Sequence, residues 1–368
     1  GSDLPPASGI RTLCMIPELP DQTHSGTLGW SCPSNIALVK YWGKKPGQIP
    51  MNPSLSMTLQ EARTRMRIQY AYVPGKGGRR LRFRFEGKEA PAFEQRINRY
   101  LEGLVSELPV LLHTHLEIDS ENSFPHSSGI ASSASAFGAL ALCLVQLEEE
   151  IRGPLEQGRF WQKASHLARL GSGSASRSMY PGFALWGRHE TWEDSSDEFA
   201  IPYQDFHSSF GDLRDAILVV ESGAKPVSSS AGHSLMETNP FARVRFAQAR
   251  ENLDRLHVAM GEGDWQGFIG LMEEEALSLH AMMMTGRPGY LLMQPETVSI
   301  LQGIRAFREE TGCRLGFTLD AGANVHLLYA GEDAARVEAF ISSELLRHCE
   351  NGRLIRDRMG EGPQKIHL

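Results

Sequence analysis

The chain has 368 residues, of which 41% are hydrophobic and 22% are charged, a composition typical of a folded globular protein with one large domain or two of ordinary size. Its formal net charge of -7 argues against a nucleic acid or an anionic membrane surface as the main partner, because both bind to a basic face. A small anionic ligand stays compatible with this charge, since a local basic pocket is hidden in the global average.

Five cysteines are scattered along the chain without a CxxC spacing, which favours a reducing compartment and argues against a disulfide framework or a zinc cluster. The longest apolar run, residues 136–147, is too short to span a bilayer. No signal peptide is visible, and the initial Gly-Ser without Met is typical of a cloning scar. We therefore expect a cytoplasmic protein.

The N-terminal part predicts a strand-rich region. Residues 1–27 are rich in Pro, Gly, Ser and Thr and are expected to form a surface extension. Residues 63–73 and 81–87 alternate apolar with polar side chains, so we expect them to pair as a hairpin. Residues 115–120 predict a further strand.

Helical patterns dominate the following segment. Residues 132–150 and 159–170 show a 3.6-residue apolar period, and the second of these predicted helices stops at Gly171. A short strand is expected at 183–187, followed by an acidic loop.

The second half again mixes strands with helices. A strand is expected at 216–222, and helices are expected near 240–260 and 264–283. Residues 314–333 predict two strands around a tight Ala-Gly-Ala turn, and residues 334–347 predict a closing helix.

These elements predict an α+β protein of two domains with a boundary near residues 205–215. We expect an N-terminal extension at 1–27, a first domain at 28–210 and a second domain at 211–368.

Two features are interpreted as structural. His113 and His115 are expected to be half-buried strand residues rather than metal ligands, because no third ligand is evident. The run of methionines at 282–284 is most simply core packing or an adaptable pocket wall.

A Gly/Ser-rich stretch at 123–140 runs directly into a predicted helix. Free backbone N–H groups at the start of a helix can bind phosphate oxygens. A serine-rich helix N-cap explains the same sequence equally well. The stretch is not a Walker A loop, because the GK[ST] ending is absent.

Three further segments bear side chains suited to an anionic ligand. The loop 171–183 interleaves serines with small residues and contains Arg177, which can hold a carboxylate or phosphate with two hydrogen bonds. Asp320 follows an apolar strand and precedes a glycine turn, where it is either a base at a pocket edge or a turn cap. Lys40, Lys44 and Lys45 form a basic group after a predicted strand. Together these features indicate phosphate chemistry.

Five segments in a fixed order resemble a known family. They are 34-SNIALVKYWGK-44, 124-FPHSSGIASSASAF-137, 171-GSGSASRS-178, 226-PVSSSAGH-233 and 318-TLDAGANV-325. The chain resembles the GHMP kinases over residues 28–360 and, through its first and third segments, the diphosphomevalonate decarboxylase family within them.

The resemblance implies a GHMP kinase fold with a ribosomal-S5-like N-terminal domain, a ferredoxin-like C-terminal domain and an active site in the cleft between them. It implies that ATP and Mg²⁺ are used to phosphorylate the 3-hydroxyl of mevalonate 5-diphosphate, after which phosphate and CO₂ leave to give isopentenyl diphosphate for isoprenoid biosynthesis. A homodimer is the common outcome for enzymes of this size.

The resemblance also implies residue roles. Asp320 would orient or deprotonate the 3-hydroxyl, Lys40 would stabilise charge at the transferring phosphoryl group, and Arg177 would hold the substrate carboxylate. Lys45 has no assigned role. The positions that match the substrate's diphosphate site are Tyr41, Lys44, Ser172, Ser174 and Ser229. Those that match the ATP-phosphate loop are His126, Ser127, Ser128, Gly129, Ala131, Ser132, Ser133 and Ser135, with Ser133 as the Mg²⁺ partner.

Some positions depart from the family pattern. Ser230 stands where many bacterial members carry Arg, Ala323 where Pro is common, and residues 126–128 read His-Ser-Ser instead of Thr-Ala-Ala. Three alternatives therefore stay open: the same chemistry on mevalonate 5-phosphate, 3-phosphorylation without decarboxylation, and a non-catalytic protein that binds ATP and a ligand.

Overall fold

The computed structural model describes residues 19–75, 78–124, 132–156, 158–223 and 229–367. Strands and helices occur together in both halves of this part of the chain, so the predicted α+β class is confirmed. None of the helices in these ranges combines the length and the apolar character that a membrane span requires. The four cysteines in these ranges are free thiols with buried side chains.

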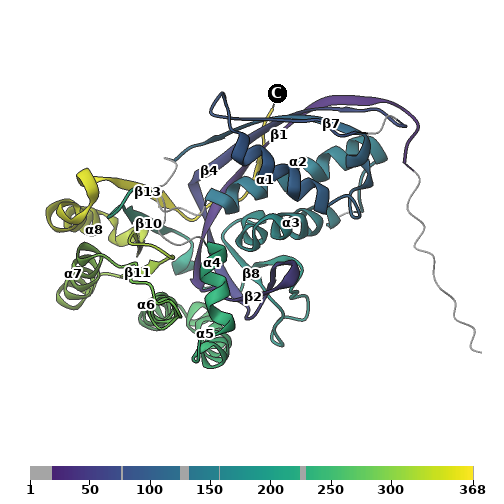
Figure 1. The fold of residues 1–368 in the computed structure, drawn as a ribbon. Coiled ribbons are helices and arrows are strands. Elements are labelled where there is room, and N and C mark those ends of the chain that lie inside the picture. Colours follow the sequence, from purple (N-terminus) through teal and green to yellow (C-terminus); the bar gives the residue numbers. More distant parts are fainter. Residues whose placement is uncertain (1–18, 76–77, 125–131, 157, 224–228, 368) are drawn as a thin grey trace, which may run out of the picture.

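A long, twisted sheet organises the first half of the molecule (Figure 1). In the described ranges its eight strands are β1 (His24–Val39), β4 (Ser54–Tyr72), β5 (Leu81–Phe85), β6 (Lys88–Glu89), β7 (Thr114–Asn122), β8 (Phe183–Trp186), β9 (Ala200–Tyr203) and β14 (Gln364–Lys365). The main order is β14-β1-β4-β7-β5-β6, and β8 joins β4 to β9. The C-terminal strand thus returns to the first sheet, beside β1.

Strand β4 is covered on one face along its second part and on both faces along its first part. Its second part alternates buried with exposed side chains, as expected where one face meets solvent. Its first part, residues 54–59, is buried on both faces. Helix α5 (Ala242–Glu262) and strand β13 (Leu354–Arg358) of the second half contact β4, so this end of the sheet is covered by the second half.

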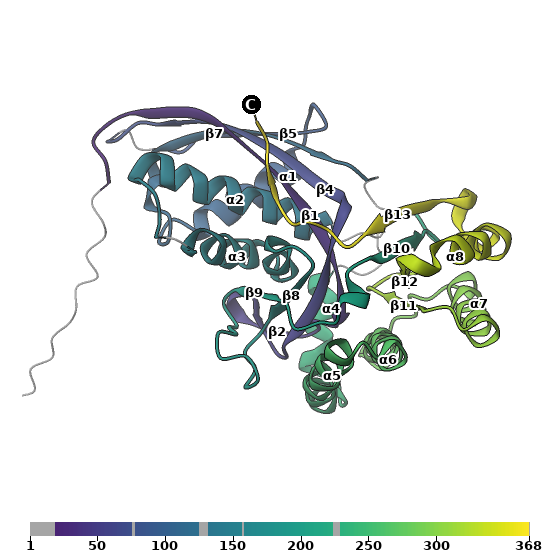
Figure 2. The ribbon, with the colours of Figure 1, turned by 180° about the vertical axis from the view of Figure 1, so that it is seen from behind.

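Three helices cover one face of the first sheet: α1 (Pro91–Gly103), α2 (Ser132–Arg152) and α3 (Arg159–Gly171) (Figures 1 and 2). Helix α2 is buried along most of its length, because it packs on β1 and β4 with one side and on α3 with another. The predicted helices at 132–150 and 159–170 are confirmed. Helix α1 was not predicted from the sequence.

The second half has a four-stranded antiparallel sheet in the described ranges. Its strands are β10 (Leu213–Leu218), β11 (Leu315–Leu319), β12 (Val325–Ala330) and β13 (Leu354–Arg358), in the order β11-β12-β10-β13. Numbered within the unit this order is 2-3-1-4, which is the ferredoxin-like arrangement expected from the resemblance.

Helices cover the second sheet and reach the first one. They are α4 (Ser229–Ser234), α5 (Ala242–Glu262), α6 (Trp265–Met284), α7 (Pro295–Thr311) and α8 (Ala334–Phe340). Gly263 ends α5 at φ +74°, and Asp264 then caps α6 by accepting the backbone N–H of Gly267 at 3.0 Å. Helix α6 contacts both β11 and β1, so it connects the two sheets next to the end of β1.

Four sequence predictions need correction. The hairpin of 63–73 with 81–87 is wrong, because β7 lies between β4 and β5 and pairs with β5 in parallel. An alternating pattern defines the buried face of a strand but not its neighbour. The strand expected at 216–222 occupies Leu213–Leu218.

The helix expected at 334–347 is regular only to Phe340 and continues as a π turn and a 3₁₀ turn to His348. His113 closes a 3₁₀ helix before β7 instead of lying in a strand, although it and His115 are both half-buried as expected.

The small hairpin of β2 (Lys44–Lys45) and β3 (Ile49–Pro50) follows β1 directly. Chain segments that leave the sheet here, together with the β11–β12 turn and α6, frame the site described next.

Candidate active site

A cavity of about 430 Å³ lies where the end of β1, the start of α2, the end of α3, α4, α6 and the β11–β12 turn meet. We refer to it as the central pocket. Nine of the residues predicted as functional line it: Lys40, Tyr41, Lys44, Ser132, Ser133, Ser172, Ser174, Arg177 and Asp320. Residues from four distant segments of the chain are thus brought together.

Lys40 and Asp320 form an ion pair inside this pocket. Lys40 is the first residue after β1, and its Nζ donates to Oδ1 of Asp320 at 3.3 Å. The side chain of Lys40 is 2% exposed, whereas that of Asp320 is 29% exposed. Burial lowers the pKa of Lys40, and the positive charge of Arg177 lowers it further. The nearby carboxylates of Asp320 and Glu275 act in the opposite direction and raise it.

Arg177 is a second buried cation of the pocket. Its Nη1 donates to Oγ of Ser54 at 2.5 Å, and its guanidinium lies 5.7 Å from the ring centroid of Trp186. Burial lowers the pKa of Arg177 to about 10, against the opposing effects of Tyr41 and Asp320. Its Nε is buried without a hydrogen-bond partner among the described residues, so a donor is available for a ligand.

Tyr41 offers a further unused polar atom. Its hydroxyl oxygen is buried and has no partner in the described part of the chain, and burial raises the pKa of this phenol. The ring lies 4.7 Å from that of Trp186 and 4.4 Å from that of His233, measured between centroids. These aromatic neighbours fix the direction of the hydroxyl group.

A row of hydroxyl groups connects two helices at the pocket. The Oγ of Ser172, just after α3, lies 3.2 Å from that of Ser133 at the start of α2 and 3.4 Å from that of Ser174. The row is suited to hydrogen bonds with phosphate oxygens. Lys44 also faces the pocket, and its Nζ donates to Oε1 of Gln48 at 2.9 Å.

The structure does not bring every predicted residue into the pocket. Ser135 is fully buried in α2, where its hydroxyl group lies 2.7 Å from that of Thr64, so the structure does not bring this predicted ATP contact into the pocket. Lys45 is exposed and lies outside the pocket, in line with its lack of an assigned role.

Six further predicted positions belong to two other segments of the chain. His126, Ser127, Ser128, Gly129 and Ala131 lie outside the described residues. Ser229 begins α4, and its side chain lies outside the described part as well.

Sequence reasoning missed His233 as a pocket residue, although it ends one of the quoted segments. Its Nδ1 accepts the backbone N–H of Gly43 at 2.9 Å, so in the neutral ring the proton is on Nε2. Burial, with contributions from Lys44 and Arg177, lowers the pKa of His233 to about 3. The residue is therefore a neutral member of a cationic pocket.

Asn35 and Arg96 were also missed, and both line the central pocket. Asn35 Nδ2 donates to the carbonyl oxygen of Ser174 at 3.0 Å and to Oγ of Ser178 at 2.8 Å, which holds the serine loop in place. Arg96 comes from α1, and its guanidinium lies 4.9 Å from the ring centroid of Phe137. Asn35 belongs to the segment 34–44, so the sequence offered a signal for it. Arg96 lies on α1, and nothing in the sequence connects that helix with the pocket.

A smaller, apolar cavity of about 70 Å³ adjoins the central pocket. It shares Arg96, Ser132 and Ser133 with that pocket and is otherwise walled mainly by apolar side chains, among them Phe93 and Phe137. We refer to it as the adjoining pocket. Its aromatic walls suit a flat, weakly polar ring.

The arrangement suits a ligand with several negative charges, which the cationic side chains would bind while the carboxylate of Asp320 acts on it. Four cationic side chains, those of Lys40, Lys44, Arg96 and Arg177, line the pocket together with Asp320, and hydroxyl groups extend the site towards the start of α2. Within the described residues no group of three His, Cys, Asp or Glu side chains could hold a metal ion. A divalent cation would therefore depend on ligand oxygens for most of its coordination.

Two family models match the chain. The "Diphosphomevalonate decarboxylase-like N-terminal domain" matches residues 32–197, and the "Mevalonate 5-diphosphate decarboxylase C-terminal domain" matches residues 216–364.

Curated relatives carry the same name. The chain is 31% identical to diphosphomevalonate decarboxylase of Eremothecium gossypii over 330 residues, which cover 85% of this chain and 80% of that protein. It is 28% identical to diphosphomevalonate decarboxylase of Saccharomyces cerevisiae over 330 residues, covering 86% and 81% of the two chains.

Solved structures are similar over almost the whole chain. Mevalonate diphosphate decarboxylase from Staphylococcus aureus superposes with a TM-score of 0.80 at 28% identity, covering 94% of this chain and 99% of that one. A complex of MDDEF with MVAPP, AMPPCP and magnesium gives a TM-score of 0.79 at 26% identity, covering 94% and 100%.

Proposed function

Since the chain belongs to the diphosphomevalonate decarboxylase family, we propose that it catalyses the ATP-dependent decarboxylation of mevalonate 5-diphosphate, with Asp320, Lys40 and Arg177 at the reacting centre. The observation that carries this proposal is the ion pair of Lys40 with Asp320 in the same pocket as the buried Arg177. A protein that only binds its ligand has no need of this trio.

The substrate is placed by matching its charges to the pocket. The carboxylate is assigned to Arg177, whose buried Nε lacks a partner among the described residues. The diphosphate end is assigned to Tyr41 and Lys44 with the hydroxyl groups of Ser172 and Ser174, and the 3-hydroxyl to Asp320. The first two assignments give each anionic group of the substrate a cation or a free hydrogen-bond donor, and the third gives the hydroxyl group an acceptor for its proton.

Phosphoryl transfer is the first step. The 3-hydroxyl oxygen bonds to the γ-phosphorus of ATP, the bond to the ADP oxygen breaks, and the hydroxyl proton goes to Asp320. A tertiary alcohol is a weak nucleophile, so a carboxylate within hydrogen-bond reach is useful. Lys40, held beside that carboxylate, stabilises the charge on the transferred group, which is the main requirement of such reactions.

Decarboxylation is the second step. The C3–O bond breaks and releases inorganic phosphate, while the bond between the carboxylate carbon and C2 supplies the electron pair of the new double bond and CO₂ leaves. The products are isopentenyl diphosphate, CO₂, ADP and phosphate. Arg177 holds the carboxylate until the bond breaks.

The nucleotide is assigned to the two cavities together. The adenine ring suits the apolar adjoining pocket, and the phosphates pass the start of α2 at Ser132 and Ser133 towards Lys40. Mg²⁺ would neutralise phosphate oxygens there, and the hydroxyl group of Ser133 is the protein ligand we assign to it. The complex of the relative MDDEF with MVAPP, AMPPCP and magnesium supports this use of nucleotide and metal.

An assay of ADP and CO₂ together tests the function. The protein is supplied with ATP, Mg²⁺ and, in separate arms, mevalonate, its 5-phosphate or its 5-diphosphate. We expect equal amounts of ADP and CO₂ with the 5-diphosphate alone. ADP without CO₂ would identify a kinase, and turnover of the monophosphate alone would replace the diphosphate as substrate.

Three further assignments complete the proposal. We place the domain boundary between residues 210 and 211, supported by the start of the second sheet at Leu213. A cytoplasmic location is supported by the free, buried thiols of the described cysteines. A homodimer is supported by exposed apolar side chains such as Phe241 and Val244 on and beside α5, and light scattering at micromolar concentration tests it.

A further inference from the structure

The backbone of Lys40 has no strand partner. β1 ends at Val39, so the N–H and C=O groups of Lys40 lie beyond the ladder with β4. Both are satisfied by side chains instead: the N–H donates to Oε2 of Glu275 at 2.8 Å, and the C=O accepts from Nδ2 of Asn52 at 3.0 Å. The position of Lys40 therefore depends on these two side chains.

The carboxylate of Glu275 is fully occupied. Its Oε2 accepts from the Lys40 N–H and from Nη2 of Arg245, and its Oε1 accepts from Nη1 of Arg245 at 2.9 Å and from Nδ2 of Asn252 at 2.8 Å. Each oxygen thus has two donors, which is the full capacity of a carboxylate. Glu275 is 0% exposed and Arg245 is 2% exposed, so neither side chain has freedom to reorient.

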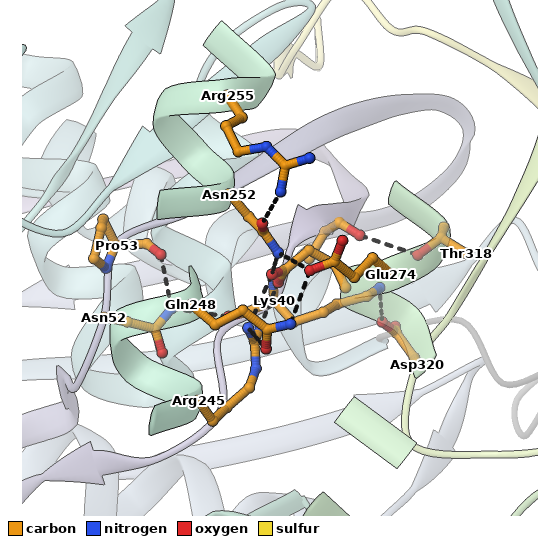
Figure 3. A network of polar contacts seen from close by, with 12 residues as sticks. Lys40, Asn52, Pro53, Arg245, Gln248, Asn252, Arg255, Glu274, Thr318 and Asp320 are labelled. Carbon is orange, nitrogen blue, oxygen red and sulfur yellow. Dashed lines mark hydrogen bonds and ion pairs between the residues drawn. The ribbon is translucent and has the colours of Figure 1, made fainter. Parts of the chain in front are cut away.

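The contacts continue across two helices (Figure 3). Arg245 and Asn252 lie seven residues apart on one face of α5, and Gln248 between them connects Arg245 to Glu274 of α6. The close-up shows these side chains gathered around Lys40, with Asp320 on its far side. The backbone of a residue in the first half is thus held by side chains of the second half.

Helix α6 holds Asp320 as well. His280 donates from Nε2 to the backbone carbonyl oxygen of Asp320 at 3.0 Å. One helix therefore fixes the backbones of both members of the Lys40–Asp320 pair, Lys40 through Glu275 and Asp320 through His280.

We propose that the buried Glu275–Arg245 pair is the positioning device of the reaction, which sets the place of Lys40 relative to Asp320 through the Lys40 backbone. Glu275 and Arg245 do not line the central pocket, so they are positioning residues and not catalytic ones. The inference rests on the proposed function in one respect, the role of Lys40.

The charge of Glu275 has a second effect on Lys40. Burial and Arg177 lower the pKa of Lys40, while Asp320 and Glu275 raise it, and the imidazoles of His280 and His326 face the same lysine. Loss of the Glu275 charge removes one of the two influences that keep Lys40 protonated. Lys40 then loses its proton at a lower pH, and the alkaline limb of kcat moves in the same direction.

The test compares Glu275→Gln with Glu273→Gln. The amide introduced by Glu275→Gln replaces one acceptor oxygen with a donor that faces two other donors, either those of Lys40 and Arg245 or those of Arg245 and Asn252. In either orientation the four-donor arrangement that holds the Lys40 backbone cannot form. Glu273 is a matched control on the same helix: it is buried and paired with Arg305 at 3.1 Å and Arg308 at 2.6 Å, but it makes no contact with Lys40. Both variants are expected to lower the Tm.

Only Glu275→Gln is expected to affect catalysis. A misplacement of Lys40 lowers kcat by ~10- to ~100-fold, the scale that small displacements of reacting groups produce. The alkaline limb of the kcat profile moves to lower pH, and KM for ATP stays within about twofold. Glu273→Gln retains the wild-type kcat and pH profile.

Hydrogen–deuterium exchange of the peptide that contains Lys40 supplies a readout independent of activity. The Lys40 amide is expected to exchange faster in Glu275→Gln than in the wild type, and at the wild-type rate in Glu273→Gln. If Glu275→Gln does not fold, the double variant Arg245→Met/Glu275→Met removes both buried charges at once and carries the same expectations.

A folded Glu275 variant with wild-type kcat, an unmoved alkaline limb and unchanged amide exchange overturns the inference. Failure of the proposed function has a different signature, because the wild-type protein would then release no CO₂ from mevalonate 5-diphosphate while the exchange difference at Lys40 persisted.

Discussion

The hydroxyl oxygen of Tyr41 occupies the space that a side chain at Gly173 would need. A Cβ built on Gly173 lies 2.7 Å from that oxygen and 2.9 Å from the ring of Trp186. The glycine of the GSGSASRS segment thus makes room for the tyrosine of the NIALVKYWGK segment, and the two sequence motifs depend on each other in space.

Gly173→Ala is therefore expected to displace Tyr41 from the diphosphate end of the substrate. We expect KM for mevalonate 5-diphosphate to rise by roughly 5- to 30-fold, equivalent to a loss of about 1 to 2 kcal/mol. Gly270→Ala on α6 is the control, because a Cβ there meets no atom within 4 Å and the change leaves KM unaltered. An unchanged KM in Gly173→Ala would remove Tyr41 from the assigned substrate site.

Arg177→Lys keeps the charge but loses the planar guanidinium fork. The lysine cannot serve Ser54 and the substrate carboxylate together, so kcat/KM is expected to fall by roughly 10- to 150-fold, equivalent to about 1.5 to 3 kcal/mol for a charge-assisted hydrogen bond. Steady-state kinetics with mevalonate 5-diphosphate measures this. A variant as active as the wild type would assign the carboxylate to another side chain.

The buried histidines predict a loss of stability in mild acid. Burial is the main cause that lowers the pKa of His233 to about 3 and that of His280 to about 4, so both remain neutral in the folded state while they are protonated in the unfolded chain below pH 6.5. Their stabilising contribution is complete above pH 6.5 and is lost as the pH falls. Between pH 6.5 and 5 the free energy of unfolding is expected to fall by roughly 2 kcal/mol for each histidine.

Urea denaturation at pH 7, 6 and 5 measures this change. His326 differs, because its partner Asp215 raises its pKa against the effect of burial, so it contributes no loss in the same window. In His233→Asn the fall in the free energy of unfolding between pH 7 and 5 is expected to be smaller by the contribution of one histidine, roughly 2 kcal/mol. An identical fall in the variant would contradict the assignment of His233 as a titrating residue.

The sequence allowed the site to be predicted better than the fold around it. Lys40, Arg177 and Asp320 belong to segments whose residue types suit phosphate chemistry on their own, and all three meet in the central pocket. Ser135 shows the limit of motif matching, because a serine one turn along α2 faces the core instead of the pocket.

Other features depend on tertiary partners that no local pattern reveals. The hairpin prediction failed because β7, distant in sequence, lies between β4 and β5. Arg96 and Glu275 are charged residues on helices, where a solvated position is the ordinary expectation. Their roles follow only from what packs against α1 and α6.

The most direct measurement of the central claim is the turnover of Asp320→Asn, with mevalonate 5-diphosphate and ATP, followed as CO₂ and ADP. The asparagine fills the same space but cannot accept the hydroxyl proton, so we expect kcat to fall by at least ~100-fold while the Kd for substrate stays near the wild-type value. Asp333→Asn, at a carboxylate that pairs with Arg314 outside the pocket, serves as the control and retains activity. A folded Asp320→Asn variant with near-normal turnover would contradict the account.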